Sequence, residues 1–139
     1  MKSRVLFICT GNSTRSQMAE GLLRHMAGEL FDVYSTGTEP RGLQPLAAQG
    51  VDISHQQSTP LQTYQYDSFD YVITLCQRAY EACHSAKGRF DTIHWDVNDP
   101  AAGNRPLDFQ MALKDLKTRL ACLVIIEEKR RKVGQGVAA

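Results

Sequence analysis

The chain has 139 residues, enough for one domain with a sizeable hydrophobic core, and its composition is ordinary for a globular protein. Its formal net charge of +1 provides no overall field for nucleic acid or a membrane surface, and no apolar run is long enough to span a membrane. The N-terminus lacks the apolar stretch of a signal peptide, so we expect a monomeric cytoplasmic domain covering residues 1–139. In the cytoplasm, four cysteines in such a chain indicate catalysis, redox chemistry or metal binding rather than structural disulfides.

Strands and helices alternate along the chain. Short runs rich in apolar and β-branched residues predict strands at Ser3–Ile8, Phe31–Thr36, Tyr71–Leu75 and Thr92–Trp95. Helices are predicted at 16–27, 45–49, near 59–60, between the cysteines at 76 and 83, and at 107–131, with a flexible tail at 134–139. This alternation indicates an α/β fold, in which a single domain holds a four-stranded parallel sheet with helices on both faces.

The last predicted helix carries an apolar face and a basic end. Apolar residues recur at helical spacing, and we expect them and Cys122 to face the core: Leu107, Met111, Leu113, Leu116, Leu120, Leu123 and Ile126. The basic run 129–132 lies at the predicted C-terminus of this helix, where positive charges complement the helix dipole. We prefer this interpretation to nucleic-acid binding.

The segment that joins the first strand to the first helix is the strongest functional motif. It places a cysteine at the end of a buried strand and an arginine just before the helix, in the run Cys9, Thr10, Gly11, Asn12, Ser13, Thr14, Arg15 and Ser16. Its backbone N–H groups and the helix N-terminus can converge on one oxyanion, while the Arg15 fork matches two oxyanion oxygens. The same field should lower the pKa of Cys9 and make it a nucleophile near neutral pH. A buried core cysteine would explain Cys9 alone, but not the residues around it.

Two further cysteines follow the third predicted strand. Cys76 ends the strand and Cys83 lies seven residues later, so in a helix they would lie about 10.5 Å apart along the axis. A disulfide needs Cα atoms within about 7 Å, so the pair can close only if the segment unwinds or loops out. We interpret the pair as a redox relay with Cys9, although each cysteine alone would fit a buried structural role. Zinc is disfavoured because the cysteines lack CxxC spacing, and we expect no metal ligands.

An Asp-Pro turn follows the fourth predicted strand. Parallel sheets bind ligands beyond the carboxyl ends of their strands, so Cys9, Cys76 and this turn should converge on one site. Pro100 stiffens the turn and holds Asp99 extended, where it could donate a proton to a leaving oxygen of the bound oxyanion. Asp-Pro is also common in ordinary turns, and the acid role gains weight only from the Cys9 loop. Asp99 is preferred to Asp96 because Asp96 lacks the rigid turn.

Together these features resemble the arsenate reductases of the low-molecular-weight tyrosine phosphatase fold that recycle through an internal cysteine pair. The resemblance extends from Lys2 to about the end of the last predicted helix. It rests on residues 9–21, 35–37 and 72–76, on Cys83, and on His94 and Trp95, which lead to residues 99–101. The loop is common to reductases and phosphatases, whereas the Cys76/Cys83 spacing and the His94–Trp95 pair are similar to the reductases.

The resemblance implies a mechanism. Cys9 attacks arsenate held by Arg15 and the backbone N–H groups of the loop, and Asp99 protonates the departing hydroxyl. Cys76 then attacks the Cys9 sulfur and arsenite leaves, after which Cys83 attacks and leaves a Cys76–Cys83 disulfide. No bound cofactor is implied. Thioredoxin is the implied external reductant, with glutaredoxin or a small thiol as alternatives.

A potassium site of some relatives is only partly matched. Asn12, Glu20 and Ser35 agree with it, but the positions that would complete it hold Gln57 and Thr59, which weighs against a bound ion.

Two alternatives stay open. A low-molecular-weight protein tyrosine phosphatase would need only Cys9, Arg15 and Asp99 and would form a phosphocysteine; the segment 99–109 has the outline of such enzymes but lacks their tyrosine pair. A reductase with weak phosphatase activity would also fit, because arsenate and phosphate share shape and charge. A non-catalytic oxyanion or redox sensor would signal through the segment 76–83, and steady-state turnover with a reductant would exclude it. The sequence departs from the relatives at two positions: Thr14 stands where they often have cysteine, and His84 stands where they commonly have proline.

Overall fold

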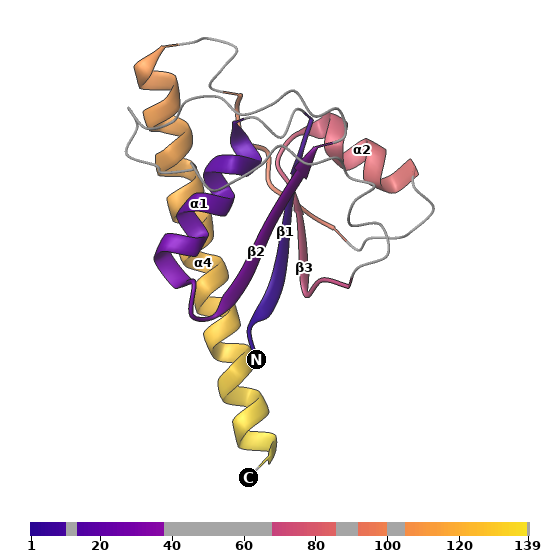
Figure 1. Cartoon of the computed structure of the whole chain (residues 1–139), viewed down its shortest axis with the longest axis vertical. Helices are drawn as coiled ribbons and strands as arrows, with labels where there is room; N and C mark the ends of the chain where they lie inside the picture. The colour runs from indigo at the N-terminus through magenta and orange to yellow at the C-terminus, as the bar shows by residue number, and fades with distance from the viewer. Residues whose placement is uncertain (11–13, 38–67, 86–91, 100–104, 139) are drawn as a thin grey trace.

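A four-stranded parallel sheet forms the centre of the fold (Figure 1). The computed structural model describes residues 1–10, 14–37, 68–85, 92–99 and 105–138 of the chain. The strands are β1 (Ser3–Cys9), β2 (Phe31–Gly37), β3 (Tyr71–Thr74) and β4 (Ile93–His94), in the order β2-β1-β3-β4. The predicted α/β fold class is confirmed, and each strand end lies within one residue of its predicted place. The helices predicted at 45–49 and near 59–60 lie outside the described residues.

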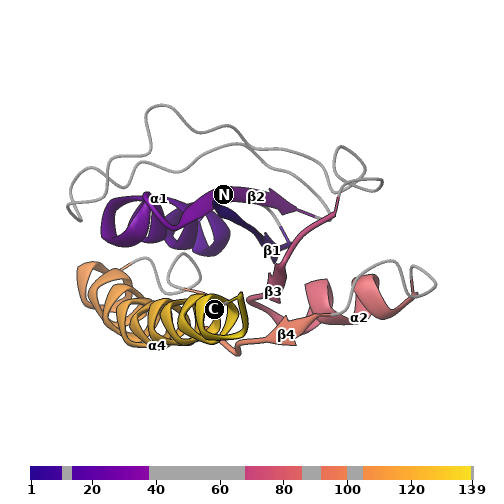
Figure 2. The ribbon, with the colours of Figure 1, turned by 90° about the horizontal axis from the view of Figure 1, so that it is seen from below.

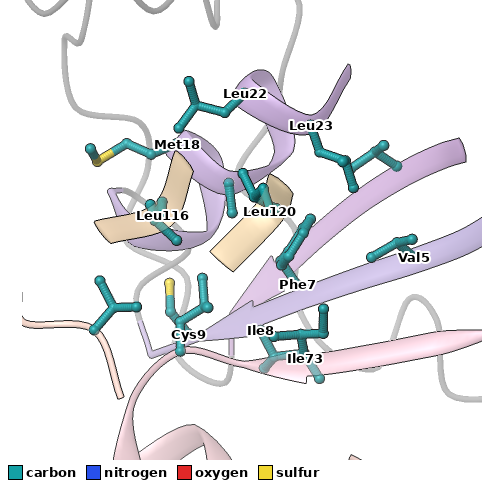
Figure 3. Close-up of a cluster of buried hydrophobic side chains, with 14 of the residues drawn as sticks. Val5, Phe7, Ile8, Cys9, Met18, Leu22, Leu23, Ile73, Leu116 and Leu120 are labelled. Carbon is teal, nitrogen blue, oxygen red and sulfur yellow. The ribbon is translucent and has the colours of Figure 1, made fainter. Parts of the chain in front are cut away.

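Helices cover both faces of the sheet. α1 (Arg15–Ala27) and α4 (Pro106–Ala138) contact each other on one face, and α2 (Gln77–Ser85) lies on the other (Figure 2). β1 lies between β2 and β3, and its apolar run 5–8 is fully buried, as is typical of a parallel strand covered on both faces. Figure 3 shows Phe7 of β1 among side chains of α1 and α4 that include Leu23 and Leu120. This packing holds the carboxyl end of β1, and therefore Cys9, in a fixed place.

The face of α4 that packs on the rest of the protein differs in part from the expected one. Its buried apolar residues are Phe109, Ala112, Leu113, Leu116, Leu120 and Leu123. Leu107, Met111 and Ile126 are more than half exposed, against expectation. Cys122 is exposed too, because a position two residues beyond Leu120 lies about 200° around the helix. The exposed and buried apolar residues share helical spacing, so periodicity alone did not separate the two faces.

α4 also extends further than expected. It runs to Ala138 rather than to about Arg131, and so includes residues 134–138 of the predicted tail. A helix that is already formed gains a hydrogen bond with each added residue, which carries it through a weak helix former such as Gly134. The basic run 129–132 therefore lies before the last turn, and its interpretation as a charge on the helix C-terminus is wrong. No helix among the described residues combines the length and apolar character needed to cross a membrane.

A buried carboxylate joins α4 to the amino ends of two strands. Glu127 is 1% exposed and accepts hydrogen bonds from Ser3 Oγ (2.7 Å), Tyr71 OH (3.0 Å) and Arg131 Nε (2.8 Å). Burial raises the pKa of this carboxyl, but the hydrogen bonds from Ser3, Arg131 and Tyr71 outweigh burial and hold its pKa below the usual range. The bonds from Ser3 and Tyr71 fix α4 to the starts of β1 and β3, at the end of the sheet opposite Cys9, while Arg131 lies on α4 itself.

Candidate active site

Cys9 lies at the carboxyl end of β1, beside the N-terminus of α1. Its side chain is 2% exposed, and its Sγ is 2.9 Å from the Oγ of Ser16, which is in the first turn of α1. The hydroxyl can donate to a thiolate at this distance, and the positive end of the helix dipole favours negative charge nearby. The predicted neighbours Gly11, Asn12 and Ser13 lie outside the described residues.

Thr14 precedes α1 and has a buried hydroxyl. Its carbonyl accepts the hydrogen bond of Met18 N (2.8 Å), but its side chain does not cap the helix. Within the described part of the chain, its Oγ1 has no hydrogen-bond partner. A buried unpaired hydroxyl costs about 1–3 kcal/mol, so a group of this kind in a folded protein calls for an explanation.

Arg15 connects this region to the segment after β4. Its Nη1 donates to the Val97 carbonyl (3.2 Å), and its Nη2 lies 3.8 Å from Asp99 Oδ2. The segment that carries Asp99 is held beside the sheet, because Trp95 N and Val97 N donate to the carbonyls at positions 74 and 75. The structure therefore brings Asp99 close to Arg15. The Asp99 side chain is 41% exposed, so water and a substrate can reach it.

Cys76 follows β3 and lies next to the same loop. The hydrogen bond from Leu75 N to the Ile8 carbonyl (2.9 Å) continues the alignment of β1 and β3 past the end of β3. Cys76 is 7% exposed, and its Sγ is 3.2 Å from the Oγ1 of Thr10, the residue after Cys9. Two neighbouring parallel strands thus deliver one cysteine each to the same edge of the sheet.

Cys83 lies on α2, and the segment between it and Cys76 is helical as predicted. Cys83 is 1% exposed, and Cys9, Cys76 and Cys83 are all free thiols. Burial, and secondarily the neighbouring Cys76, raises the pKa of Cys83 to about 11. Cys83 is therefore a protonated, unreactive thiol as long as α2 keeps this form.

Three other features were missed in the sequence. His94 Nδ1 is 2.9 Å from Thr74 Oγ1, and its ring contacts the ring of Tyr80 on α2. A cavity of about 280 Å³ lies between Asp99 and the start of α4, with Met111 in its lining. These two features depend on residues that are distant in sequence, and no local pattern signals them.

The third feature concerns the residues that matched a potassium site. Glu20 accepts a hydrogen bond from Ser35 on one oxygen and from Arg24 Nη2 (2.6 Å) on the other, and Arg24 also donates to the Val33 carbonyl. The positively charged guanidinium of Arg24 thus forms an ion pair with Glu20. Among the described residues, no three His, Cys, Asp or Glu side chains are grouped so that they could hold a metal ion.

Comparisons with known proteins agree with this architecture. The family model for low molecular weight phosphotyrosine protein phosphatase matches residues 4–135. An arsenate reductase of Halalkalibacterium halodurans is 40% identical over 105 residues, which cover 72% of this chain and 76% of that protein. A solved structure described as an arsenate reductase in the phosphate binding state aligns with a TM-score of 0.72 and 30% identity, over 90% of this chain and 98% of that one. A thioredoxin-dependent arsenate reductase of Corynebacterium glutamicum aligns with a TM-score of 0.73 and 28% identity, over 93% of this chain and 63% of the other.

Proposed function

Because this chain belongs to the low molecular weight phosphotyrosine protein phosphatase family, and because a cysteine lies at or just beyond the carboxyl end of each of its two central strands, we propose that it reduces arsenate to arsenite by a three-cysteine relay. The curated relative described above is an arsenate reductase, and it covers most of the length of this chain. Residues 1–139 act as one catalytic domain without a bound cofactor, and thioredoxin supplies the electrons. A cytoplasmic location suits this role, because thiols are kept reduced there.

In the first step, arsenate binds in the loop 10–16 and the Cys9 thiolate attacks arsenic. A sulfur–arsenic bond forms, an arsenic–oxygen bond breaks, and the oxygen leaves as water with a proton from Asp99. The Ser16 hydroxyl, 2.9 Å from Cys9 Sγ, stabilises the thiolate before the attack. Arg15 holds the arsenate oxygens and lies 3.8 Å from Asp99, so one guanidinium positions both the substrate and the acid.

In the second step, the Cys76 thiolate attacks Cys9 Sγ. The sulfur–sulfur bond forms as the sulfur–arsenic bond breaks, and its electron pair stays on arsenic, which becomes arsenite. The Thr10 hydroxyl at 3.2 Å from Cys76 Sγ supports this step, because it can donate to the thiolate and direct the sulfur toward Cys9.

In the third step, Cys83 attacks Cys76 Sγ and the Cys9 thiolate leaves. The product is a Cys76–Cys83 disulfide, which an external dithiol reduces with two electrons and two protons. Cys83 cannot act from its place in α2, because it is buried with a pKa of about 11 and helical geometry keeps it too far from Cys76. The relay therefore requires α2 to unwind, which also exposes the thiol to water and brings its pKa toward the usual range.

The observation that carries this proposal is the contact between Thr10 and Cys76. It places a second buried thiol beside the residue that follows Cys9, and a phosphatase mechanism has no use for that thiol. The test is a single-turnover reaction with arsenate and no reductant, followed by acid quench and mass spectrometry of the disulfides. The wild type should release one arsenite and hold a Cys76–Cys83 disulfide, whereas Cys83→Ser should accumulate a Cys9–Cys76 disulfide.

The exposed Cys122 offers a matched control for that experiment, because it lies on the outer face of α4. Cys122→Ser should behave as the wild type does. Release of arsenite with no protein disulfide in any variant would rule out the relay.

Phosphomonoester hydrolysis is the second candidate function, and the Arg15–Asp99 pair favours it. Cys9, Arg15 and Asp99 are sufficient for a phosphocysteine intermediate and its hydrolysis, and the family model that matches is that of a phosphatase. Hydrolysis of p-nitrophenyl phosphate should then be lost with Cys9→Ser and unaffected by Cys83→Ser. The ratio of arsenate turnover to phosphatase turnover decides between the two functions.

A further inference from the structure

Two rings join α2 to the neighbouring strand of the sheet. Tyr80 lies in the middle of α2 and His94 lies in β4, with ring centroids 4.9 Å apart and ring planes tilted by 44°. His94 Nδ1 is also 2.9 Å from the Oγ1 of Thr74 in β3, a residue that is fully buried. The imidazole is therefore braced by β3 on one side and presents its ring to α2 on the other.

Among the residues whose burial is described, α2 buries few of its side chains. Ala79 and Cys83 are its buried side chains within the described residues, whereas Gln77, Arg78 and Glu81 are exposed. Under the proposed relay, Cys83 gives up its buried place when it reacts. Tyr80 then still ties α2 to the sheet through its ring contact with His94.

We propose, as an extension of the proposed relay, that the Tyr80–His94 contact holds α2 in its helical form and so favours the dithiol over the Cys76–Cys83 disulfide. Tyr80 and His94 are positioning residues in this proposal, because neither touches the reacting sulfur atoms. The contact sets how readily Cys83 leaves its buried place, and thereby sets the reduction potential of the cysteine pair.

Residues seven apart in a helix lie about 10.5 Å apart along the axis, and a disulfide requires Cα atoms within about 7 Å. Tyr80 lies between the two cysteines, so the backbone turn that carries it must change when they join. The Tyr80–His94 contact therefore belongs to the dithiol form and is broken in the disulfide form. An interaction present only in the dithiol form makes the disulfide easier to reduce, as for any oxidant stabilised in its reduced state.

The first test measures the potential of the cysteine pair by equilibration with glutathione redox buffers. Tyr80→Ile removes the ring but keeps a similar helix propensity, and Tyr80→Phe keeps the ring. An aromatic pair of this kind should shift the equilibrium about two- to tenfold toward the disulfide in Tyr80→Ile. This corresponds to a potential more negative by about 10–30 mV, since tenfold is 29.6 mV for two electrons. Tyr80→Phe keeps the ring contact, so its potential should lie closer to that of the wild type than the potential of Tyr80→Ile does.

A double-mutant cycle assigns the effect to the contact. His94→Gln removes the imidazole and keeps a side chain that can hydrogen-bond Thr74, and it should shift the potential in the same direction. The double variant Tyr80→Ile/His94→Gln should have a reduction potential no more negative than that of the single variant with the larger shift. Additive shifts, equal potentials in Tyr80→Ile and Tyr80→Phe, or a shift to more positive potential would each overturn the proposal.

A second measurement does not depend on the relay. Hydrogen exchange of the α2 amides in the fully reduced protein should be about two- to tenfold faster in Tyr80→Ile than in Tyr80→Phe, because local unfolding costs less without the ring contact. Equal exchange in the two variants would overturn the role of the contact. A further outcome is that exchange differs between the variants while oxidised wild type contains no Cys76–Cys83 disulfide. In that case the contact stabilises α2, but the relay and the proposed effect of the contact on its reduction potential are both refuted.

Discussion

Replacement of Glu127 by Gln tests the buried cluster that anchors α4. The carboxylate is 1% exposed and accepts three hydrogen bonds of 2.7–3.0 Å, two from hydroxyl groups and one from a guanidinium. Gln keeps the shape but is neutral and replaces one accepting oxygen by an NH₂ group, so all three donors lose a charged acceptor and at least one loses its acceptor altogether. One hydrogen bond to a charged group is worth about 1.5–3 kcal/mol, and we expect Glu127→Gln to lower the free energy of unfolding by about 2 kcal/mol.

Urea denaturation at pH 7 measures this loss, and Glu128→Gln is the matched control because Glu128 is the exposed neighbour on the same helix. The control should change stability by less than about 0.5 kcal/mol. The pKa of Glu127 is lowered in the folded protein, so its contribution is complete above the ordinary value of 4.5 and is lost as the pH falls through the folded pKa. The difference between wild type and Glu127→Gln should therefore shrink in acid. An equal, small effect of both substitutions would refute the assignment of Glu127 as the anchor.

Three further predictions concern the site. Ser16→Ala removes the hydroxyl 2.9 Å from Cys9 Sγ and should slow arsenite formation in a single turnover by about 10- to 100-fold. An unchanged rate would show that this hydroxyl does not stabilise the thiolate. Asp99→Asn should lower the same rate by about 10²- to 10⁴-fold through loss of the acid, and a rate within threefold of wild type would exclude that role. In the reduced protein, iodoacetamide followed by mass spectrometry should label exposed Cys122 first and Cys83, buried with a pKa of about 11, last; the reverse order would contradict the position of Cys83.

The position of Cys9 at the end of β1 and of Arg15 at the start of α1 was predictable from the sequence because these elements are neighbours along the chain. A strand, a loop and a helix N-terminus that follow one another must place Cys9 and Arg15 near the same helix end. The rule that ligands bind beyond the carboxyl ends of parallel strands added Cys76 and Asp99. The contact of Cys76 with Thr10 was not predictable in its detail, because it depends on the register of β3 against β1.

α4 shows where periodicity fails. Leu107, Met111 and Ile126 are apolar and helically spaced, yet they are exposed, because the phase of the buried face is set by the shape of the sheet and α1. Glu127 lies in a charged stretch that is typical of a solvated surface. Its burial depends on Ser3 and Tyr71, which are far away in the sequence.

The most direct test of the account is steady-state arsenate reduction coupled to thioredoxin, thioredoxin reductase and NADPH, with wild type, Cys83→Ser and Cys122→Ser compared at equal concentration. The account predicts continuous NADPH oxidation by wild type and Cys122→Ser, while Cys83→Ser stops after a single equivalent of arsenite. A wild type that is inert toward arsenate, but hydrolyses p-nitrophenyl phosphate as fast as Cys83→Ser does, would contradict it.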